Sequence, residues 1–464
     1  MSGPLDLTAV FSALSADDRE SLAAVPDEEQ RSVLLHDLLA DHGLLDVDNL
    51  AVAENVLIYP ELRDEVFSRL PVLPVRSTKY VSPAYGTPEL TALVADRLGR
   101  SLGVEIEIKN VFGAAGVSGA LSCIALGLQL AGKSSNPPVP RGSSVLLPAP
   151  FWQGFYWCFQ QQAGLVCHPV ALKDEVTFQL TLEDLERAYD EAEQPRLLVL
   201  TNPHNPLGYN YDRQLLESVY EWALAKHMHV ISDEMYCHSQ LLASTTPFIS
   251  ALTLDAVRAR PDRVHVVWGF AKDFGLSGFR AGFIISQSEW VHRVMTGDAE
   301  RRRTSQAWFS TYGSLKHFVT REVLVAEEYG FWDRVMRLYR HRLTEAFDAV
   351  ARVLDAYEVP YVHRPRANSA QFFWLDLREY LVDQATTTPV SALFGDHRSS
   401  DAEKVLAKDI AEHARVQLLT GTTLSCPEPG YFRLCFTAIE TDRVVEAVER
   451  MCRYLRERRG QPSP

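Results

Sequence analysis

The sequence predicts an α/β fold, with a large domain whose mostly parallel β-sheet lies between helices and a smaller α+β domain. From about residue 110, strand-like, turn-like and helical patterns alternate, which is typical of a parallel sheet covered by helices. The strand-like segments are almost continuously apolar, as expected of strands buried on both faces. The chain has 464 residues, more than one compact core usually holds, so we expect more than one domain.

The elements divide the chain into three parts. Residues 1–75 carry the apolar stripes of helices, as in RSVLLHDLLADHGLL, and we assign them to an N-terminal segment that is part of the small domain. Residues 76–310 are the expected large domain, with strands at NVFGAAG, SSVLLP, LVCHPVAL, RLLVLTN, HVISDE, VHVVWGF and AGFIIS. Residues 311–464 are the expected C-terminal small domain, where the helical VLVAEEYGFWDRVMRLYRHRLTEAFDAVARVL precedes strand-like QFFWLDL and YFRLCFTAI.

Composition excludes several classes of function. The 60 acidic and 46 basic residues give a formal net charge of -14, which argues against nucleic acid or an anionic membrane as a partner. The seven cysteines are scattered, without a CxxC pair or metal-ligand spacing, so we expect neither a disulfide framework nor a metal site. The start of the chain lacks the pattern of a signal peptide and no segment is long and apolar enough to span a bilayer, so we expect a cytoplasmic protein.

Ligands of open parallel sheets bind at the carboxyl ends of the strands, so the residues after each strand are the candidates for a site. After NVF, the turn GAAGVSG opens a helix with Gly116, Val117 and Ser118, whose N–H groups could hold a phosphate. Such a glycine-rich turn is as often only structural. After SSVLLP, Trp152 in APFWQGFYW could stack on a flat ring or belong to an aromatic core.

Three further strand ends carry polar residues. Asn205 lies in NPHNPLG, where an amide can bind a ligand or simply complete a turn. Asp233 and Tyr236 lie in SDEMY, and a helix cap is the alternative for the aspartate. Lys272 and Arg280 lie among apolar residues in GFAKDFGLSGFRAG, where a charge is costly to bury unless it is paired or used covalently.

Together these strand ends offer a phosphate site, a ring-stacking aromatic, an acid, a phenol, an amide, a lysine and an arginine. This set matches one cofactor, pyridoxal 5′-phosphate. The lysine amine would bind the aldehyde as a Schiff base, and the acid would pair with the protonated pyridine nitrogen. The amide and the phenol would hold the ring hydroxyl, while the arginine and the helix-start N–H groups would hold the phosphate.

The order of NPHNPLG, SDEMY and AKDFGLSGFRAG resembles the fold type I, class I/II aminotransferase family over about residues 50–440. Further segments resemble one branch of it, the 1-aminocyclopropane-1-carboxylate (ACC) synthases. These segments are LAVAENV, YGTPEL, PAPFW and LLTGTTLSCPEPGYFRLCF. The resemblance implies an aspartate aminotransferase-like fold and a homodimer in which the YGTPEL region reaches across the subunit boundary.

The resemblance also implies roles for individual residues. Lys272 would be the Schiff-base lysine and the base that moves the Cα proton, and Arg433 would bind the substrate α-carboxylate. Glu54 and Asn55 of LAVAENV would belong to the substrate site, with the glutamate near a sulfonium cation; a glutamate on a helix surface is the alternative. The implied cofactor contacts are Asp233 on the pyridine nitrogen, Asn205 and Tyr236 on the ring hydroxyl, Trp152 on the ring face, and Arg280 with Gly116, Val117 and Ser118 on the phosphate.

The chain departs from the family pattern at several positions. Gly269 and Ala271 stand where serine is common, and Ala84 stands where the ACC synthases have a phosphate-binding tyrosine. Tyr85, or the more distant Tyr80, could replace that tyrosine. In NSAQF a further position, Gln371, is polar where the family is apolar, which could alter substrate contacts or be a neutral surface change.

These observations favour an enzyme that removes the Cα proton of an amino acid and then expels a γ-leaving group. S-Adenosylmethionine is the expected substrate because of Glu54, and the four-carbon unit would close to a cyclopropane or pass to a second small molecule. The departures favour a specialised member over a standard ACC synthase. An aminotransferase acting with a 2-oxo acid is the alternative, and a non-catalytic binding protein is disfavoured by Lys272, Asp233 and Arg433.

Overall fold

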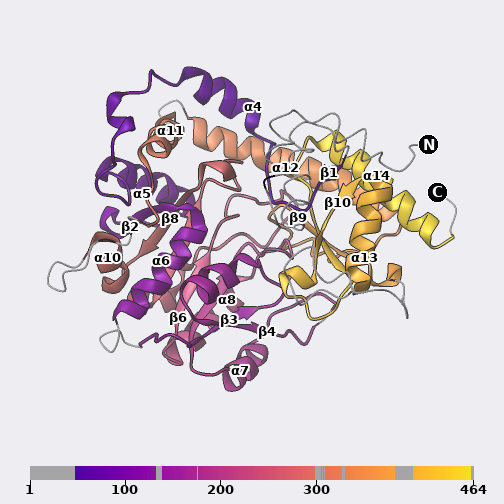
Figure 1. Cartoon of the computed structure of the whole chain (residues 1–464), viewed down its shortest axis with the longest axis horizontal. Helices are drawn as coiled ribbons and strands as arrows, with labels where there is room; N and C mark the ends of the chain where they lie inside the picture. Colours follow the sequence, from indigo (N-terminus) through magenta and orange to yellow (C-terminus); the bar gives the residue numbers. More distant parts are fainter. Residues whose placement is uncertain are drawn as a thin grey trace.

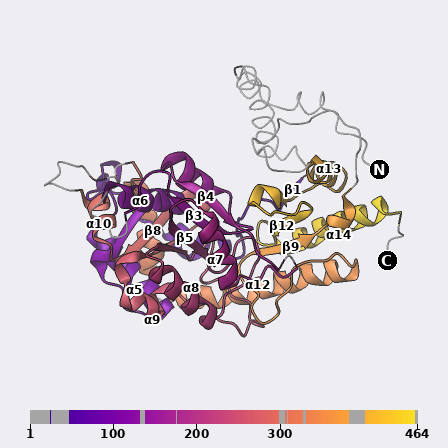
Figure 2. The same cartoon turned by 90° about the horizontal axis from the view of Figure 1, so that it is seen from below.

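The computed structural model describes residues 24, 47–131, 138–174, 176–297, 305, 307, 309–326, 330–381 and 401–460. A large sheet with its helices lies beside a smaller part that contains the C-terminal elements (Figures 1 and 2). Within these described ranges, no helix has both the length and the apolar character needed to cross a membrane. The predicted helical segment RSVLLHDLLADHGLL lies outside them.

The large sheet has seven strands in the order β2-β8-β7-β6-β5-β3-β4. Strand β3 pairs in parallel with β4 and β5, and β6 pairs in parallel with β5 and β7, whereas β8 is antiparallel to both β7 and β2. Six of the seven strands fall within the predicted segments, and β5 begins one residue before its segment, so the expected mostly parallel sheet is confirmed. The strands are β2 (Val111–Ala115), β3 (Ser144–Pro148), β4 (Val166–Val170), β5 (Pro195–Thr201), β6 (His229–Asp233), β7 (Val264–Gly269) and β8 (Ala281–Ser286).

The continuous apolar runs are explained by burial of both faces of this sheet. Leu146, Leu198 and Val230 pack in one apolar core, while their sequence neighbours Val145 and Leu197 pack in another. Because side chains alternate along a strand, these two cores lie on opposite faces. Helix α6 (Gly116–Ala131) contributes to the second core, and α7 (Leu182–Glu191) and α8 (Arg213–Ala225) contribute to the first.

Helix starts in this part follow ordinary capping chemistry. Thr181 and Asp184 form a reciprocal capping box at α7, and the side chain of Asp212 caps α8. Thr87 caps α5 (Pro88–Leu102), which carries proline in its first turn. The remaining helices here are α9 (Asp255–Ala259) and α10 (Glu289–Thr296).

The smaller part contains a three-stranded antiparallel sheet in the order β11-β12-β9. Both strand-like segments predicted there form strands, in β9 and β12. The N-terminal strand β1 pairs in parallel with β10. The strands are β1 (Asp48–Asn49), β9 (Phe372–Asp376), β10 (Val416–Gln417), β11 (Leu419–Thr420) and β12 (Tyr431–Cys435). Its helices are α12 (Phe331–Ala356), α13 (Asp401–Asp409) and α14 (Thr441–Arg458). Two further helices are α4 (Tyr59–Glu61) and α11 (Ser314–Val325), and α11 packs against α5 beside the large sheet (Figure 1).

Two sequence expectations differ in detail from this structure. The helical pattern at 323–354 belongs to two helices, because α11 ends at Val325 and α12 begins at Phe331. In 47–75, helical structure is confined to α4 and single turns at Leu62–Val66, Phe67–Arg69 and Val75–Thr78. The division into domains at residues 75 and 310 stays a prediction.

The buried carboxylate of Glu403 organises the loop before β12. It accepts hydrogen bonds from the backbone N–H groups of Gly421 at 3.1 Å, Thr422 at 3.3 Å and Gly430 at 3.1 Å, and from the Thr422 hydroxyl. The same loop meets the large sheet, since the Leu424 carbonyl accepts from Phe151 N at 2.7 Å. Glu403 therefore stabilises a junction between the two sheets.

We predict that Glu403→Gln lowers the free energy of unfolding by about 2 kcal/mol, because an amide NH₂ would face backbone donors that now meet an acceptor. Urea unfolding at neutral pH measures this change. The exposed Glu428→Gln is the matched control and should leave the midpoint unchanged. Equal midpoints for both variants would contradict the assignment.

Candidate active site

Lys272 lies in the turn between β7 and β8, at the carboxyl edge of the parallel strands. Its Nζ donates to the carbonyl of Ala53 at 2.6 Å. Its own carbonyl oxygen accepts from Asn55 Nδ2 at 2.9 Å and Gln371 Nε2 at 3.0 Å. Burial lowers the pKa of the Lys272 amine, while the nearby charge of Glu54 opposes this shift. Hydrogen bonds therefore hold both the side-chain amine and the backbone carbonyl of the lysine, and the amine is largely shielded from water.

Gly269, one of the departures from the family pattern, lies at a close backbone approach. It pairs with Gly282 across β7 and β8, and a Cβ at position 269 would lie 2.5 Å from the carbonyl oxygen of Ala281. A serine hydroxyl at this position would require the strands to separate. The close pairing explains why glycine stands here, and it leaves any phosphate to other groups.

Asp233 ends β6, next to Thr201 of β5 and Val267 of β7 in register. Burial raises the pKa of its carboxyl group to about 7, and the Lys272 charge acts in the opposite direction. Among the described residues, this carboxylate receives one hydrogen bond, from Met235 N at 3.4 Å. It forms no ion pair within the same set, so a cation brought by a ligand would stabilise its charged form.

Arg433 of β12 is buried, so the alternative of an exposed strand arginine is wrong. Its Nη1 donates to Asn205 Oδ1 at 2.8 Å and its Nη2 to the Ala51 carbonyl at 2.6 Å. Its Nε is buried without a partner in the described part of the chain, and no carboxylate pairs with it there. Burial lowers the pKa of the guanidinium, with the Tyr236 hydroxyl acting in the opposite direction.

Tyr236 shares this environment. Burial raises the pKa of its hydroxyl well above the usual value, and the Arg433 charge opposes the rise. The Tyr236 ring packs edge-on against the Phe372 ring at 5.3 Å between centroids, and the guanidinium of Arg433 lies over the Phe372 ring at 4.6 Å. The structure thus brings Asn205, Arg433 and Tyr236 together.

Positive charge gathers at the start of α6. Gly116 has φ +75°, and a Cβ there would lie 2.8 Å from Nη2 of Arg280, so the exposed guanidinium lies against the helix start. Lys316 donates to the Arg280 carbonyl at 2.6 Å, and burial lowers the pKa of its amine to about 8. A helix start and neighbouring cations repel one another unless an anion lies between them. This arrangement suits a phosphate bound by Val117 and Ser118 N–H groups.

The predicted aromatic contacts lie at the rim of the site. Trp152 is half-buried and meets the rings of Phe155 at 5.5 Å and Trp157 at 6.0 Å, both edge-on. Tyr85 is half-buried against Phe112 at 5.3 Å, whereas Tyr80 is 90% exposed. Roles for Trp152 and Tyr85 in cofactor binding stay predictions.

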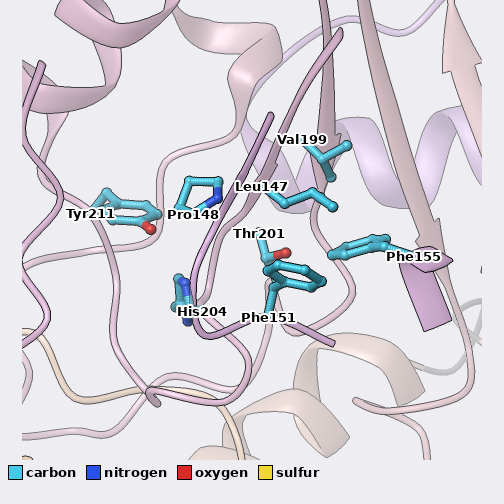
Figure 3. A pocket seen from close by; sticks show the side chains of 8 residues that line it. All are labelled: Leu147, Pro148, Phe151, Phe155, Val199, Thr201, His204 and Tyr211. Atoms are coloured by element: carbon cyan, nitrogen blue, oxygen red, sulfur yellow. The ribbon is translucent and has the colours of Figure 1, made fainter. Parts of the chain in front are cut away.

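A mostly apolar pocket lies at the ends of β3 and β5, with Phe151 and Phe155 in its lining (Figure 3). His204, next to the Asn205 position, lines it, and burial lowers the pKa of this imidazole to about 3. This histidine is therefore neutral at physiological pH. The pocket is lined by Leu147, Pro148, Phe151, Phe155, Val199, Thr201, His204 and Tyr211.

Glu54 and Asn55 contact different parts of the segment that begins at Lys272. Both carboxylate oxygens of Glu54 lie 2.6 Å from the Ser277 hydroxyl, and no lysine or arginine forms an ion pair with this carboxylate among the described residues. The Asn55 amide is buried and donates to the carbonyls of Lys272 and Asp273, at 2.9 and 3.1 Å. Asn55 therefore holds the lysine turn, and its predicted contact with substrate is untested.

Sequence reasoning missed several groups around Lys272. The Ala51 and Ala53 carbonyls, which accept from Arg433 and Lys272, have no side chain that could signal this role. Asp273, which follows the lysine in sequence, was not singled out. Asp273 lies within 4.8 Å of Cys237 and His238, a geometry that could hold a metal ion although the sequence spacing predicts no metal site. Its carboxylate already accepts from Ser239 Oγ at 2.6 Å and His238 N at 3.1 Å, so the group is satisfied within the protein.

The predicted cofactor fits the charges of this site. Asp233 lacks a cation, Arg433 lacks a carboxylate, and Arg280 lies against a helix start without an anion among the described residues. Pyridoxal 5′-phosphate with a bound amino acid carries the complementary groups, which are a ring nitrogen, an α-carboxylate and a phosphate. The unpartnered Nε of Arg433 would find an acceptor in that carboxylate.

Comparisons with known proteins agree with this fit. The model of the family "Aminotransferase class I and II" matches residues 72–451. The 1-aminocyclopropane-1-carboxylate synthase 1 of Prunus mume is 27% identical over 80% of this chain and 69% of its own length. The probable aminotransferase aclI of Aspergillus oryzae is 33% identical over 67% of this chain and 69% of its own length.

Solved structures agree on the fold. The aspartate aminotransferase of Thermus thermophilus with maleate superposes with a TM-score of 0.66 at 21% identity, covering 95% of this chain and 99% of its own. The expected aspartate aminotransferase-like fold is thereby confirmed. The chain belongs to the class I and II aminotransferase family, and it is a pyridoxal-phosphate-dependent enzyme.

Proposed function

We propose that this enzyme removes the Cα proton of S-adenosylmethionine and expels methylthioadenosine from Cγ. The four-carbon unit then closes to a cyclopropane or passes to a second small molecule. The observation that carries the proposal is the Glu54 carboxylate, which lies near Lys272, accepts from the Ser277 hydroxyl and forms no ion pair with a lysine or arginine side chain among the described residues. A carboxylate in that state favours a cationic substrate, and a sulfonium is a permanent cation.

The cofactor, when bound, supplies an aldehyde for the substrate amine and a ring that accepts the electron pair left at Cα. In this proposal Lys272 takes the Cα proton on Nζ, since burial favours the neutral amine that a base requires. Asp233 in its ionised form holds a positive charge on the ring nitrogen, and Tyr236 and Asn205 hold the ring hydroxyl. Trp152 covers the ring face.

The same proposal assigns the anionic ends. Arg433 binds the substrate α-carboxylate, which fixes the direction of the Cα–H bond relative to Lys272. Arg280 and the N–H groups at the start of α6 bind the phosphate, with Lys316 nearby. Tyr85 adds a phosphate contact, and Asn55 contributes to the substrate site by placing the lysine turn.

Transamination is the second candidate, because the relative aclI, at 33% identity, is named a probable aminotransferase. It would use the same lysine, aspartate and arginine, and it would need a 2-oxo acid as the second substrate. Glu54 would have no cationic substrate group to pair with in that reaction.

We also propose a homodimer and a cytoplasmic location. Exposed apolar side chains between residues 72 and 80 support the dimer, because several such side chains in one short segment suit a contact with a second copy. They include Val72 at 94%, Val75 at 72% and Tyr80 at 90% exposure, and Phe309 is a further exposed ring at 87%.

All seven cysteines are buried and free, which supports a reducing compartment. The predicted domains are 1–75 with 311–464 as the small domain, and 76–310 as the cofactor-binding domain.

Replacing Lys272 with alanine should abolish turnover, with a loss of about a thousandfold or more, because no other base is held at this position. The cofactor absorbance that depends on the lysine should disappear in the same variant. Lys226→Ala, which removes an ammonium over Tyr189, is the control and should behave as wild type. Turnover that survives in Lys272→Ala would exclude the lysine as the base.

Replacing Glu54 with glutamine should raise KM for S-adenosylmethionine about tenfold or more, since one charge pair near the protein surface contributes roughly 1–4 kcal/mol. Mass spectrometry of released methylthioadenosine measures the reaction, and exposed Glu107→Gln serves as the control. Wild-type protein that releases no methylthioadenosine but exchanges amino groups with a 2-oxo acid would refute the proposal in favour of transamination.

A further inference from the structure

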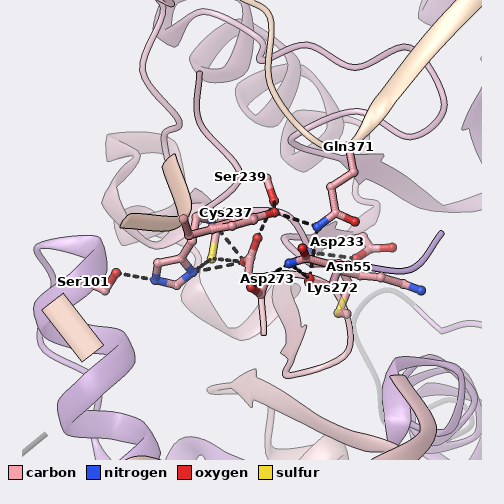
Figure 4. A network of polar contacts seen from close by, with 11 residues as sticks. Asn55, Ser101, Asp233, Cys237, Ser239, Lys272, Asp273 and Gln371 are labelled. Atoms are coloured by element: carbon pink, nitrogen blue, oxygen red, sulfur yellow. Dashed lines mark hydrogen bonds and ion pairs between the residues drawn. The ribbon is translucent and has the colours of Figure 1, made fainter. Parts of the chain in front are cut away.

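The carbonyl oxygen of Lys272 accepts three hydrogen bonds from three separate segments. The donors are Asn55 Nδ2 at 2.9 Å, Gln371 Nε2 at 3.0 Å and the backbone N–H of Gly275 at 3.2 Å. Figure 4 shows Asn55 and Gln371 meeting at the lysine turn. The backbone that carries the lysine is thus fixed by more than its own turn.

Gln371 is fully buried, so its interpretation as a neutral surface change is wrong. One amide serves two acceptors, because Nε2 also donates to the Tyr339 hydroxyl at 2.7 Å. Its Oε1 is buried without a hydrogen-bond partner among the described residues. Burying an unpaired oxygen costs free energy, so the polar side chain is explained by its two donated hydrogen bonds and not by its oxygen.

The orientation of this amide follows from the groups beyond it. The Ser239 hydroxyl donates to Asp273 Oδ1 at 2.6 Å. Ser239 Oγ therefore accepts from the Tyr339 hydroxyl, 2.7 Å away. The Tyr339 oxygen is then left as an acceptor for Gln371. The donors and acceptors therefore follow one order: Gln371 donates to Tyr339, Tyr339 to Ser239, and Ser239 to Asp273.

Gln371 itself lies between the lysine turn and the strand that carries Arg433. Gln371 immediately precedes β9, which pairs with β12 so that Trp374 lies opposite Arg433. The Gln371 carbonyl also accepts from Phe436 N at 3.1 Å. The residue therefore connects the strands that carry the proposed carboxylate-binding arginine to the peptide that carries Lys272.

We propose that Gln371 is a positioning residue for Lys272, which it holds at a fixed place relative to Arg433 by donating to the lysine carbonyl. The proposal rests on the proposed role of Lys272 as the base. Gln371 does not touch the reacting atoms, and it acts by limiting the movement of the turn at Lys272–Gly275.

The test is hydrogen exchange in the cofactor-free protein, followed for the Gly275 amide. Gln371→Leu removes the donor, and the near-isosteric Gln371→Met guards against a packing defect. We expect exchange to be about three- to tenfold faster in both, since one buried hydrogen bond less holds the turn. Gln129→Leu, which removes a glutamine amide bonded to the Ala163 carbonyl near the far end of α6, is the matched control and should leave Gly275 unchanged.

Turnover of the cofactor-loaded variants is the second readout. We expect Gln371→Met to lower kcat about three- to tenfold with KM changed less than twofold, because lysine placement affects proton transfer more than substrate binding. Tyr339→Phe keeps the donation to Lys272 and should have a smaller effect on both readouts. Wild-type exchange at Gly275 in both Gln371 variants would overturn the proposal, as would an equal effect of Tyr339→Phe.

The two readouts separate this inference from the proposed function. Faster exchange without any loss of kcat would show that the turn is held by Gln371 but that Lys272 placement does not limit the reaction, which would overturn the positioning role. If the wild-type enzyme instead transaminated and did not release methylthioadenosine, the proposed function would fail while the exchange result stood.

Discussion

The site depends on charged groups that are kept from water without counter-ions of their own. Asp233 and Arg433 are 5% and 4% exposed, and neither forms an ion pair with another described residue. Burial disfavours the charged form of each group, and no ion pair with another described residue offsets the free energy lost in removing these charges from water. A ligand that brings a ring nitrogen and a carboxylate offsets that cost, so binding and charge pairing are the same event.

Keeping these charges in place requires segments that are distant in sequence. The N-terminal residues 51–55 bind Arg433 through the Ala51 carbonyl, the Lys272 ammonium through the Ala53 carbonyl and the Lys272 backbone through Asn55. This segment therefore contacts both the lysine turn of the large sheet and the arginine of the small one. Figure 4 shows how closely the polar groups around the lysine turn are packed.

The sequence predicts the parts of this enzyme that have a side-chain signal. The seven strands of the large sheet were located because both of their faces are apolar, and Lys272 and Asp233 were singled out because they are charged residues at the ends of apolar strands. Arg433 was identified through the resemblance to the aminotransferase family. Backbone acceptors such as the Ala53 carbonyl carry no such signal, since any residue has one. Gln371 was recognised as unusual, but its contact with Lys272 depends on the pairing of β9 with β12, which one sequence does not encode locally.

The charges of this site that lack ion-pair partners among the described residues are complementary to one cofactor and its amino-acid substrate. The most direct test is a crystal structure with pyridoxal 5′-phosphate and an unreactive analogue of S-adenosylmethionine. We expect Asp233 within about 3 Å of the ring nitrogen, Arg433 on the analogue carboxylate, Arg280 on the phosphate and Glu54 facing the sulfonium position. A cofactor bound away from Lys272, or an analogue whose carboxylate avoids Arg433, would contradict this expectation.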